Sequence, residues 1–362
     1  MGIFYIIFAI ISSLGFLEVI SNAGYLEDDR LIIKHQKFQK IFYIVACSLL
    51  FVMAILRSEY WGTDTASYKT YYFDYYGFVT LKELFAQIIT RDIGFDLLGK
   101  FIRIFTNEYW AWRAAISSLG LILYFIVIYK DSSYPTLSLL FIYSAICSYS
   151  FFILRMGIAL AICFVAKFFY KKGNVKRAVL LIFLATTFHK SSIFAFYPML
   201  AMKIIERKKF TLKKVIMQMV LLTGAFAIFV PVMAMLYQRG LYTTDNDFQG
   251  DGMLILLIGI FIVIGWIINS QGLREINNIA IDFNFALVAI MMQIGALFLG
   301  ILYRAGFYFS DSLSLLLPNI IASKKKVSAR VLLYFIYLIG CLLWFTLFDG
   351  MLTHGPFLIH QF

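Results

Sequence analysis

The sequence predicts an all-helical, polytopic integral membrane protein, and two observations support this prediction. Of the 362 residues, 62% are hydrophobic and only 14% are charged, with a mean hydropathy of +0.84, whereas about a quarter of the residues in a soluble domain are charged. Many apolar stretches also approach the roughly 20 residues that a helix needs to cross a bilayer. Because unpaired backbone polar groups are costly in lipid, each such stretch is predicted to be a helix.

The apolar stretches give the order of the predicted spans along a single transmembrane domain, residues 1–362. The stretch 178–205 divides into halves that are each too short to cross the membrane untilted, so we predict a broken helix pair there. Counting this pair as two passes gives about 12 membrane segments. The other candidate spans are 3–22, 40–56, 113–129, 135–154, 156–170, 213–237, 253–269, 283–302, 305–322 and 331–348.

The placement of the basic residues predicts the orientation in the membrane. The chain has 32 lysines and arginines against 20 aspartates and glutamates, and most of the basic residues fall in alternate connections between the spans. Cytoplasmic connections are enriched in lysine and arginine, so both termini are predicted to lie outside. Because the charges lie at span ends and form no basic face with interleaved aromatic residues, we expect the lipid bilayer, and no nucleic acid, as a partner.

Two long connections are predicted on the outer side. Residues 57–112 are rich in aromatic residues, and apolar residues at helical spacing in their second half predict short amphipathic helices at the outer interface. The second outer loop, 238–252, contains Asp245-Asn246-Asp247, which resembles part of a calcium loop, but Leu256 would stand where such a loop needs a bidentate glutamate. We therefore expect no metal site and no cofactor.

Two polar residues stand out within apolar sequence. Arg155 lies between two apolar runs with almost no loop to solvate it, and a charge near the bilayer interior is expensive. It is interpreted as a clamp for an anion, the alternative being a snorkelling or topological arginine. His189 lies at the apex of the broken segment, and imidazole exchanges protons readily near neutral pH. It is a candidate for proton transfer, the alternative being a hydrogen-bonded structural histidine.

A third group lies just outside the second span. Arg57, Trp61, Asp64 and Tyr68 combine an arginine, a carboxylate and aromatic rings within twelve positions. This pattern is typical of a platform for sugars and anions, because aromatic rings stack on sugar faces and a carboxylate accepts hydrogen bonds from sugar hydroxyls. The alternative is an interfacial turn.

In four pieces the chain resembles the EpsG and Wzy-type O-antigen or capsule polymerases of bacterial inner membranes. The family commonly has a glutamate where this chain has Asp92, and the resemblance is compatible with a fold of GT-C-like character. The four pieces are R-S-E-Y-W-G-T-D-T-A-S-Y at 57–68, R-D-I-G-F at 91–95, R-M-G-I-A-L-A-I at 155–162 and A-T-T-F-H-K-S-S at 185–192.

The resemblance implies a membrane glycosyltransferase. It would join oligosaccharide repeats carried on undecaprenyl diphosphate, at the periplasmic or exterior face of the inner membrane, and a chain-length regulator protein would be a partner. The leaving group is a diphosphate, whose growing charge guanidinium groups can stabilise without a metal. Direct displacement would invert the anomeric carbon. The residues implied are Arg155, Arg304, Arg57 and Arg91 for the diphosphate, His189 or Asp64 for the acceptor proton, and Tyr68, Trp61 and Asp92 for sugar.

Three other functions remain open at this level. A flippase or other transporter of lipid-linked oligosaccharide would need a charged path through the membrane. The inner halves of the predicted spans show few ionisable residues, and Lys167 and Asp282 lie near their cytoplasmic ends. A polysaccharide ligase would use the same chemistry with another acceptor. A membrane O-acyltransferase would take its acyl donor from the cytosol, whereas His189 is predicted to face outward.

Overall fold

A computed structural model describes the greater part of the chain. The predicted span 213–237, Trp61 and most of the second outer loop lie largely or wholly outside the described residues. The described residues are 2–21, 24–27, 30–33, 36–57, 64–86, 91–146, 153–196, 199, 216–217, 220, 224, 252–269, 277–297 and 301–347.

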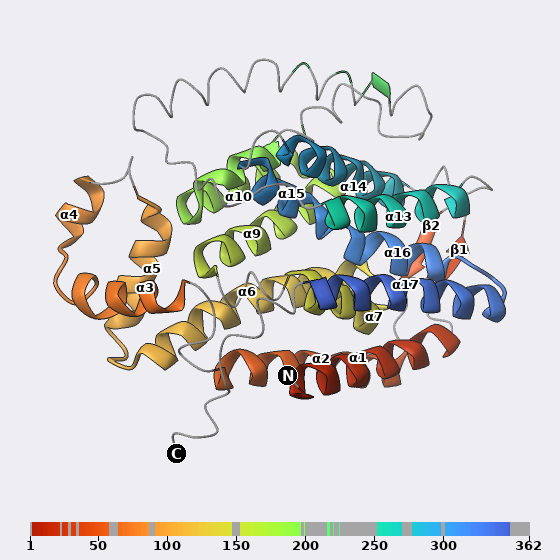
Figure 1. Cartoon of the computed structure of the whole chain (residues 1–362), viewed down its shortest axis with the longest axis horizontal. Coiled ribbons are helices and arrows are strands. Elements are labelled where there is room, and N and C mark those ends of the chain that lie inside the picture. Colours follow the sequence, from red (N-terminus) through yellow and green to blue (C-terminus); the bar gives the residue numbers. More distant parts are fainter. Residues whose placement is uncertain are drawn as a thin grey trace.

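Long apolar helices run side by side through the molecule (Figure 1). Five of the described helices are long and apolar enough to cross a membrane, which confirms the helical membrane-protein class. The total of about 12 segments and the location of the termini stay predictions. The five are α1 (Gly2–Ser21), α2 (Lys37–Leu56), α6 (Tyr109–Asp131), α14 (Asn277–Ala296, apolar from Ile279) and α17 (Val327–Leu347). Beside them lie α9 (Leu154–Lys171) and α13 (Gly252–Asn269).

Shorter elements complete the bundle. Helix α7 (Pro135–Phe141) continues into a π-helical turn, η2 (Ile142–Ile146), and α10 (Val175–Phe188) is followed by a short 3-10 helix, η3 (Lys190–Ala195). The predicted span 305–322 is instead two helices, α15 (Ile301–Ser310) and α16 (Leu313–Ala322). The break falls at Asp311 and Ser312, where polar side chains offer the backbone other hydrogen-bond partners.

The connections gather at opposite ends of the bundle (Figure 1). Helices α3 (Thr65–Thr70), α4 (Leu81–Ala86) and α5 (Ile93–Arg103), with the π-helical turn η1 (Tyr71–Tyr75), lie at what we call the loop end. At the other end, the hairpin end, β1 (Gly24–Glu27) pairs antiparallel with β2 (Arg30–Ile33). The sequence analysis did not predict this hairpin.

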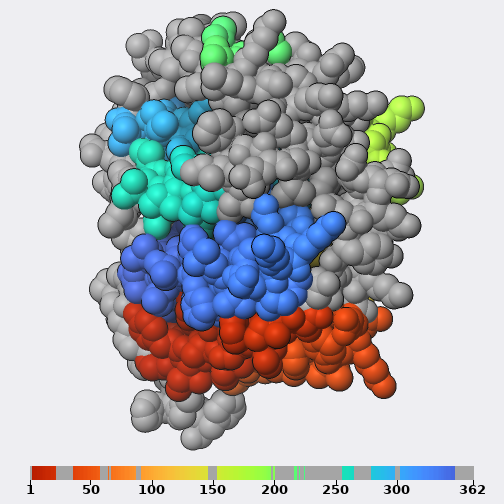
Figure 2. Space-filling model, turned by 90° about the vertical axis from the view of Figure 1, so that its right-hand side faces the viewer, coloured from red at the N-terminus to blue at the C-terminus, as the bar shows by residue number. Residues whose placement is uncertain are grey.

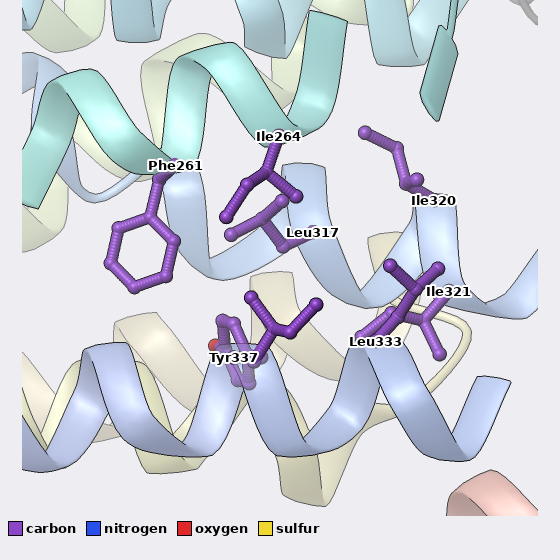
Figure 3. Close-up of a pocket in the computed structure, with 8 residues that line it drawn as sticks. Phe261, Ile264, Leu317, Ile320, Ile321, Leu333 and Tyr337 are labelled. Carbon is purple, nitrogen blue, oxygen red and sulfur yellow. The ribbon is translucent and has the colours of Figure 1, made fainter. Parts of the chain in front are cut away.

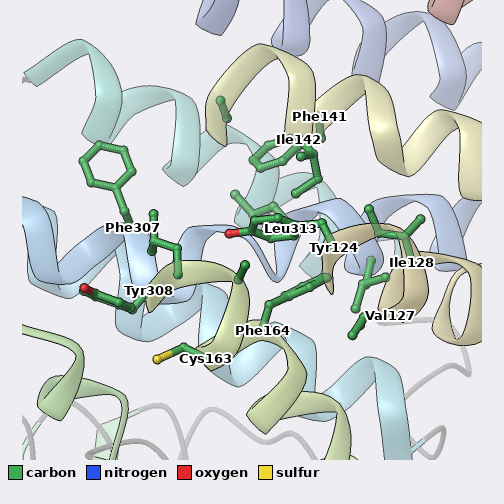
Figure 4. Packing of buried hydrophobic residues seen from close by; sticks show 14 of the residues in the cluster. Tyr124, Val127, Ile128, Phe141, Ile142, Cys163, Phe164, Phe307, Tyr308 and Leu313 are labelled. Carbon is green, nitrogen blue, oxygen red and sulfur yellow. The ribbon is translucent and has the colours of Figure 1, made fainter. Parts of the chain in front are cut away.

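The bundle is layered, and its centre is fully buried. Seen from the hairpin end, the red and orange N-terminal helices form the lowest layer, the blue C-terminal helices lie above them, and teal α13 lies above those (Figure 2). Every residue of α7 and of α16 is buried, and Phe141, Phe164 and Leu313 belong to the same buried hydrophobic cluster (Figure 4). Helices α1, α2, α10, α13 and α17 expose large apolar side chains outward, as lipid-facing helices do.

Two buried charged residues close helix ends near the hairpin end. The first amide groups of a helix have no partner within it, and those of α7 donate to the buried Glu18 carboxylate of α1, at 3.0 Å from Thr136 N and 3.2 Å from Leu137 N. The last carbonyls of α1 accept from Arg330 of α17, at 3.1 Å from Nε to Val19 O. These bonds tie α1 to α7 and to α17.

The inner part of the bundle holds more ionisable residues than the sequence analysis expected. Lys171 of α9 forms ion pairs with Asp131 at 2.5 Å and with Asp282 at 2.6 Å. One helical turn away, Lys167 pairs with Asp311. All five side chains are at most 4% exposed. The structure thus adds Asp131, Lys171 and Asp311 to Lys167 and Asp282, and Asp131 and Lys171 are the last residues of α6 and α9.

An apolar pocket lies between α13, α16 and α17 (Figure 3). Its walls are aliphatic and aromatic, with Phe261, Leu317 and Leu333 on three sides and the Tyr337 hydroxyl as the polar group. That hydroxyl is itself bonded to Leu137 O at 3.3 Å. No charged side chain lines this pocket.

Candidate functional site at the loop end

A close contact joins α5 to α10. A Cβ atom built on Gly94, in the first turn of α5, would lie 2.2 Å from Oγ1 and 2.9 Å from Cβ of Thr187, near the end of α10. Only glycine fits this approach without displacement. The contact therefore brings Asp92, which precedes α5, close to His189, which follows α10.

His189 lies at the break between α10 and η3, with its side chain 17% exposed and both ring nitrogens buried. Its backbone is extended (φ −159°, ψ 119°), although its amide still donates to Ala185 O at 2.9 Å. The preceding threonines turn their hydroxyls back onto the helix, with Thr187 donating to Leu184 O at 2.7 Å. The imidazole thus stands at a helix terminus and is not part of a continuous helix.

Asp92 is the centre of the site. Its Oδ2 atom lies 3.2 Å from Nη1 of Arg155, at the start of α9, and 3.6 Å from Nδ1 of His189. The Asp92 side chain is 10% exposed, that of His189 17% and that of Arg155 45%. The arginine can therefore meet a ligand while the carboxylate holds it, and catalytic hydrogen bonds are often long before substrate binds. The sequence analysis assigned Asp92 to sugar and did not predict this arrangement.

The ring of Tyr68 lies against the guanidinium group of Arg155. The guanidinium carbon lies 5.8 Å from the centre of the Tyr68 ring, within the range of a cation–π contact. Tyr68 packs on Phe95 and Trp112 at ring distances of 5.7 and 6.4 Å. Burial raises the pKa of Tyr68, with Arg155 acting in the opposite direction, so the phenol stays protonated at neutral pH and can donate a hydrogen bond.

A second wall comes from η3 and α15. The hydroxyls of Ser191 and Tyr308 lie 3.1 Å apart, and Tyr308 interacts electrostatically with both Asp92 and Arg304. Arg304 is half-buried and lies one helical turn before Tyr308. The sequence analysis included Arg304 but not Tyr308, because a tyrosine inside an apolar run carries no signal of its own. Ser191 was visible beside His189.

Arg91 has a different neighbourhood from Arg155. Its Nε lies 3.1 Å from Oδ2 of Asp96, and its guanidinium stacks 3.9 Å from the centre of the Tyr75 ring. Asp96 also accepts from the Tyr76 hydroxyl at 2.9 Å. Burial raises the pKa of Asp96, and Arg91 opposes that effect. The structure thus places Arg91 in a contact that fixes α5 on η1, beside the site.

The platform predicted at 57–68 is divided by the structure. Arg57 is fully buried at the end of α2, where its carbonyl accepts from Arg113, a second fully buried arginine. Asp64 precedes α3, is half-exposed, and interacts electrostatically with Tyr68. Trp61 lies outside the described residues. Of this group, Tyr68 contacts the Asp92 and Arg155 centre directly, with Asp64 near it.

The side chains gathered at the site can bind anions and exchange protons. Within the described ranges, no group of three or more His, Cys, Asp or Glu side chains could hold a metal ion. An arginine half open to solvent, a histidine beside a carboxylate and two hydroxyls can bind a phosphate-like oxygen and accept a proton from a hydroxyl.

Comparison with known families gives a match over most of the chain. A family model described as the EpsG family matches residues 40–356, a range that contains every residue of the site. No curated protein and no solved structure shows a significant match.

Proposed function

We propose that this protein, which belongs to the EpsG family, is a polysaccharide polymerase that joins lipid-linked oligosaccharide repeats. Family membership indicates polymerase-type work in polysaccharide biosynthesis. The finer proposal is a glycosyltransferase of a bacterial inner membrane, with undecaprenyl-diphosphate oligosaccharides as both donor and acceptor and with the loop end facing the exterior. The convergence of Asp92, Arg155 and His189 at that end is the observation that carries it.

The proposed reaction is a single displacement. The acceptor hydroxyl oxygen attacks the anomeric carbon of the donor and forms the new C–O bond, while the bond from that carbon to the diphosphate oxygen breaks. The bonding electrons leave with the diphosphate, and the hydroxyl proton passes to His189. The anomeric carbon is inverted. Both ring nitrogens of His189 are buried without a hydrogen-bond partner among the described residues, so the acceptor hydroxyl must enter the site to meet a nitrogen that can take its proton.

Each neighbour of His189 has a part in this scheme. Asp92 orients the imidazole and stabilises its charged form after proton transfer, in the way that a carboxylate supports a catalytic histidine. Arg155 meets the diphosphate oxygens, where charge develops in the transition state. The buried hydroxyls of Tyr308 and Ser191 offer hydrogen bonds at the inner wall of the site, and Arg304 lies one helical turn before Tyr308. Arg57 and Arg91, which the sequence analysis named after Arg155 and Arg304 as diphosphate ligands, act in the scaffold around the site.

The test is polymerisation by the purified protein in nanodiscs. One defined undecaprenyl-diphosphate repeat is supplied, and products are separated on a gel. We expect a ladder of repeats from the native protein and its loss in Arg155→Ala and His189→Ala. Arg103→Ala is the matched control, because Arg103 is also an arginine at the loop end but stacks on Tyr72 at 4.6 Å, away from Asp92. No ladder from folded protein given a cognate repeat would refute the proposal.

Transport of the same lipid-linked units is the second candidate, favoured by the buried ionic residues around Lys167 and Lys171. Charged residues within membrane spans often mark transport pathways. If the protein moves a fluorescent lipid-linked repeat across the membrane of vesicles without polymerising it, transport would be supported. A polysaccharide ligase would extend a different acceptor and would show product only when that acceptor is added.

A further inference from the structure

The break between α15 and α16 lies deep in the bundle, next to an ion pair that the proposed reaction does not use. Asp311 and Ser312, at the break, are at most 1% exposed. A helix that ends there leaves its last carbonyl groups without partners in the helix. In the interior of a membrane protein such groups must be satisfied by protein.

Lys167 of α9 satisfies this end of α15. Its ammonium donates to Tyr308 O at 2.9 Å and to Ser312 Oγ at 3.3 Å, and it forms an ion pair with Asp311. Figure 4 shows the Tyr308 side chain beside Cys163, which lies one turn before Lys167 in α9. Tyr308 therefore joins two centres, because its carbonyl binds Lys167 and its hydroxyl lies 3.1 Å from Ser191 in the candidate site.

Helix α9 belongs to both centres. Arg155 stands at its first turn and Lys167 lies 12 residues later, which corresponds to about 18 Å along the helix. The helix thus holds Asp92 at one end and the break after α15 at the other. The opposite end of α15 is held by α14, where Gln293 donates to Tyr303 O at 3.0 Å and lies so close to Gly306 that a Cβ there would come within 2.3 Å of Nε2.

A buried ion pair is a weak source of stability, because removing both charges from water often costs as much as their attraction returns. Retention of such a pair is best explained where it fixes one arrangement among several. We infer that the Lys167–Asp311 pair is a positioning device that sets α15 against η3, and so places Tyr308 and Arg304 in the candidate site. Its effect on catalysis rests on the proposed function.

The chain supplies a matched control. Lys171 lies one turn further along α9, is 1% exposed and is also ion-paired, but its partners are Asp131 at the end of α6 and Asp282 of α14. The test pair of substitutions is Lys167→Met with Asp311→Leu, and the control pair is Lys171→Met with Asp282→Leu. Each removes one ammonium and one carboxylate, so the net charge is unchanged. The control pair also leaves Asp131 without its ammonium, so it is the more disruptive of the two and native-like exchange near α15 is a stringent expectation for it.

The first measurement does not depend on activity. Hydrogen–deuterium exchange of the protein in nanodiscs is followed in peptides that cover residues 301–322 and 189–196. We expect faster exchange in both regions for the test pair and native-like exchange there for the control pair. Native-like exchange in the test pair, or equal acceleration in the two pairs, would overturn the inference whether or not the native protein polymerises.

The second measurement connects positioning to catalysis. We expect kcat/KM for repeat addition to fall at least tenfold in the test pair and less than twofold in the control pair, at matched thermal stability. If Lys167 acts through Tyr308, then adding Tyr308→Phe to the test pair will cost less than Tyr308→Phe costs the native protein, because coupled residues are not additive. Additive losses would overturn the route through Tyr308. If the native protein gives no ladder, the proposed function is refuted. The positioning inference is then still decided by the exchange experiment.

Discussion

The substitution Gly94→Ala tests whether the contact between α5 and α10 builds the site. The new Cβ would lie 2.9 Å from Cβ and 3.1 Å from the carbonyl carbon of Thr187, whereas carbon atoms in contact are about 3.5–4.0 Å apart. Rotation of Thr187 can move its hydroxyl, which would be only 2.2 Å away, but cannot move Cβ or the carbonyl. The two helices must therefore separate by roughly 1 Å.

That separation carries Asp92 away from His189, because each lies within two residues of the contact. A misplacement of about 1 Å can cost about 100-fold in rate, so we expect polymerisation by Gly94→Ala to fall by about that factor. The stability cost is smaller. Overpacking costs about 1–3 kcal/mol, and replacing a helical glycine returns about 0.5–1 kcal/mol, which leaves a net loss of about 0–2.5 kcal/mol.

Two variants separate misplacement from general damage. Gly99→Ala, also in α5, would put a Cβ 2.6 Å from the Tyr76 ring, on a contact that does not face α10, and should lose stability with little loss of rate. Adding Thr187→Gly to Gly94→Ala removes both side-chain contacts and leaves the 3.1 Å approach to the carbonyl carbon, so it should restore part of the rate. The assay is the gel ladder with thermal unfolding alongside. Full activity of Gly94→Ala would refute the assignment of the site to this junction.

Three further outcomes are expected. Arg155→Lys keeps the charge but loses the planar fork that matches two diphosphate oxygens, so initial rates should fall about tenfold or more, about 1.4 kcal/mol of transition-state stabilisation; unchanged rates would argue against a clamp. Lys171→Met leaves Asp131 and Asp282 buried without their ammonium and should lower the free energy of unfolding by about 3–5 kcal/mol, measured by chemical denaturation in detergent; native stability would show that the carboxylates are neutral or solvated. EDTA should leave the ladder intact, and a loss reversed by added Mg²⁺ would contradict charge stabilisation by arginine alone.

Parts of the fold that depend on local sequence could be predicted from it. The apolar runs that became α1, α2, α6 and α17 are long, uniform and bounded by polar residues, so length and hydropathy suffice to place them. The polar sequence around His189 interrupts an apolar stretch, and α10 ends at Phe188. In each case unpaired backbone groups are so costly in a membrane that an apolar run must form a helix.

Contacts between distant positions were not accessible in the same way. Asp92 and Arg155 are 63 positions apart, and Lys167 and Asp311 are 144 apart, so no spacing rule relates them. Asp311 within the apolar run 305–322 was a usable signal, because an isolated carboxylate in a span requires a partner. Arg57 was assigned to the site wrongly, because it is close to Asp64 in the sequence. In the structure it is buried beside Arg113.

The two candidate functions differ in what they require of the buried ions. A transporter must move charged or polar groups through the bundle, so its ionic residues need alternative partners during the cycle. In the described part of the bundle, the Lys171 ammonium already serves two carboxylates and Lys167 serves Asp311 together with a backbone carbonyl. Each break in these contacts would leave a charge buried without compensation, which is strongly unfavourable. Ions held this tightly suit a fixed scaffold, and the half-exposed Arg155 at the loop end, where the sugar portion of a lipid-linked acceptor can approach, suits the chemistry of a polymerase.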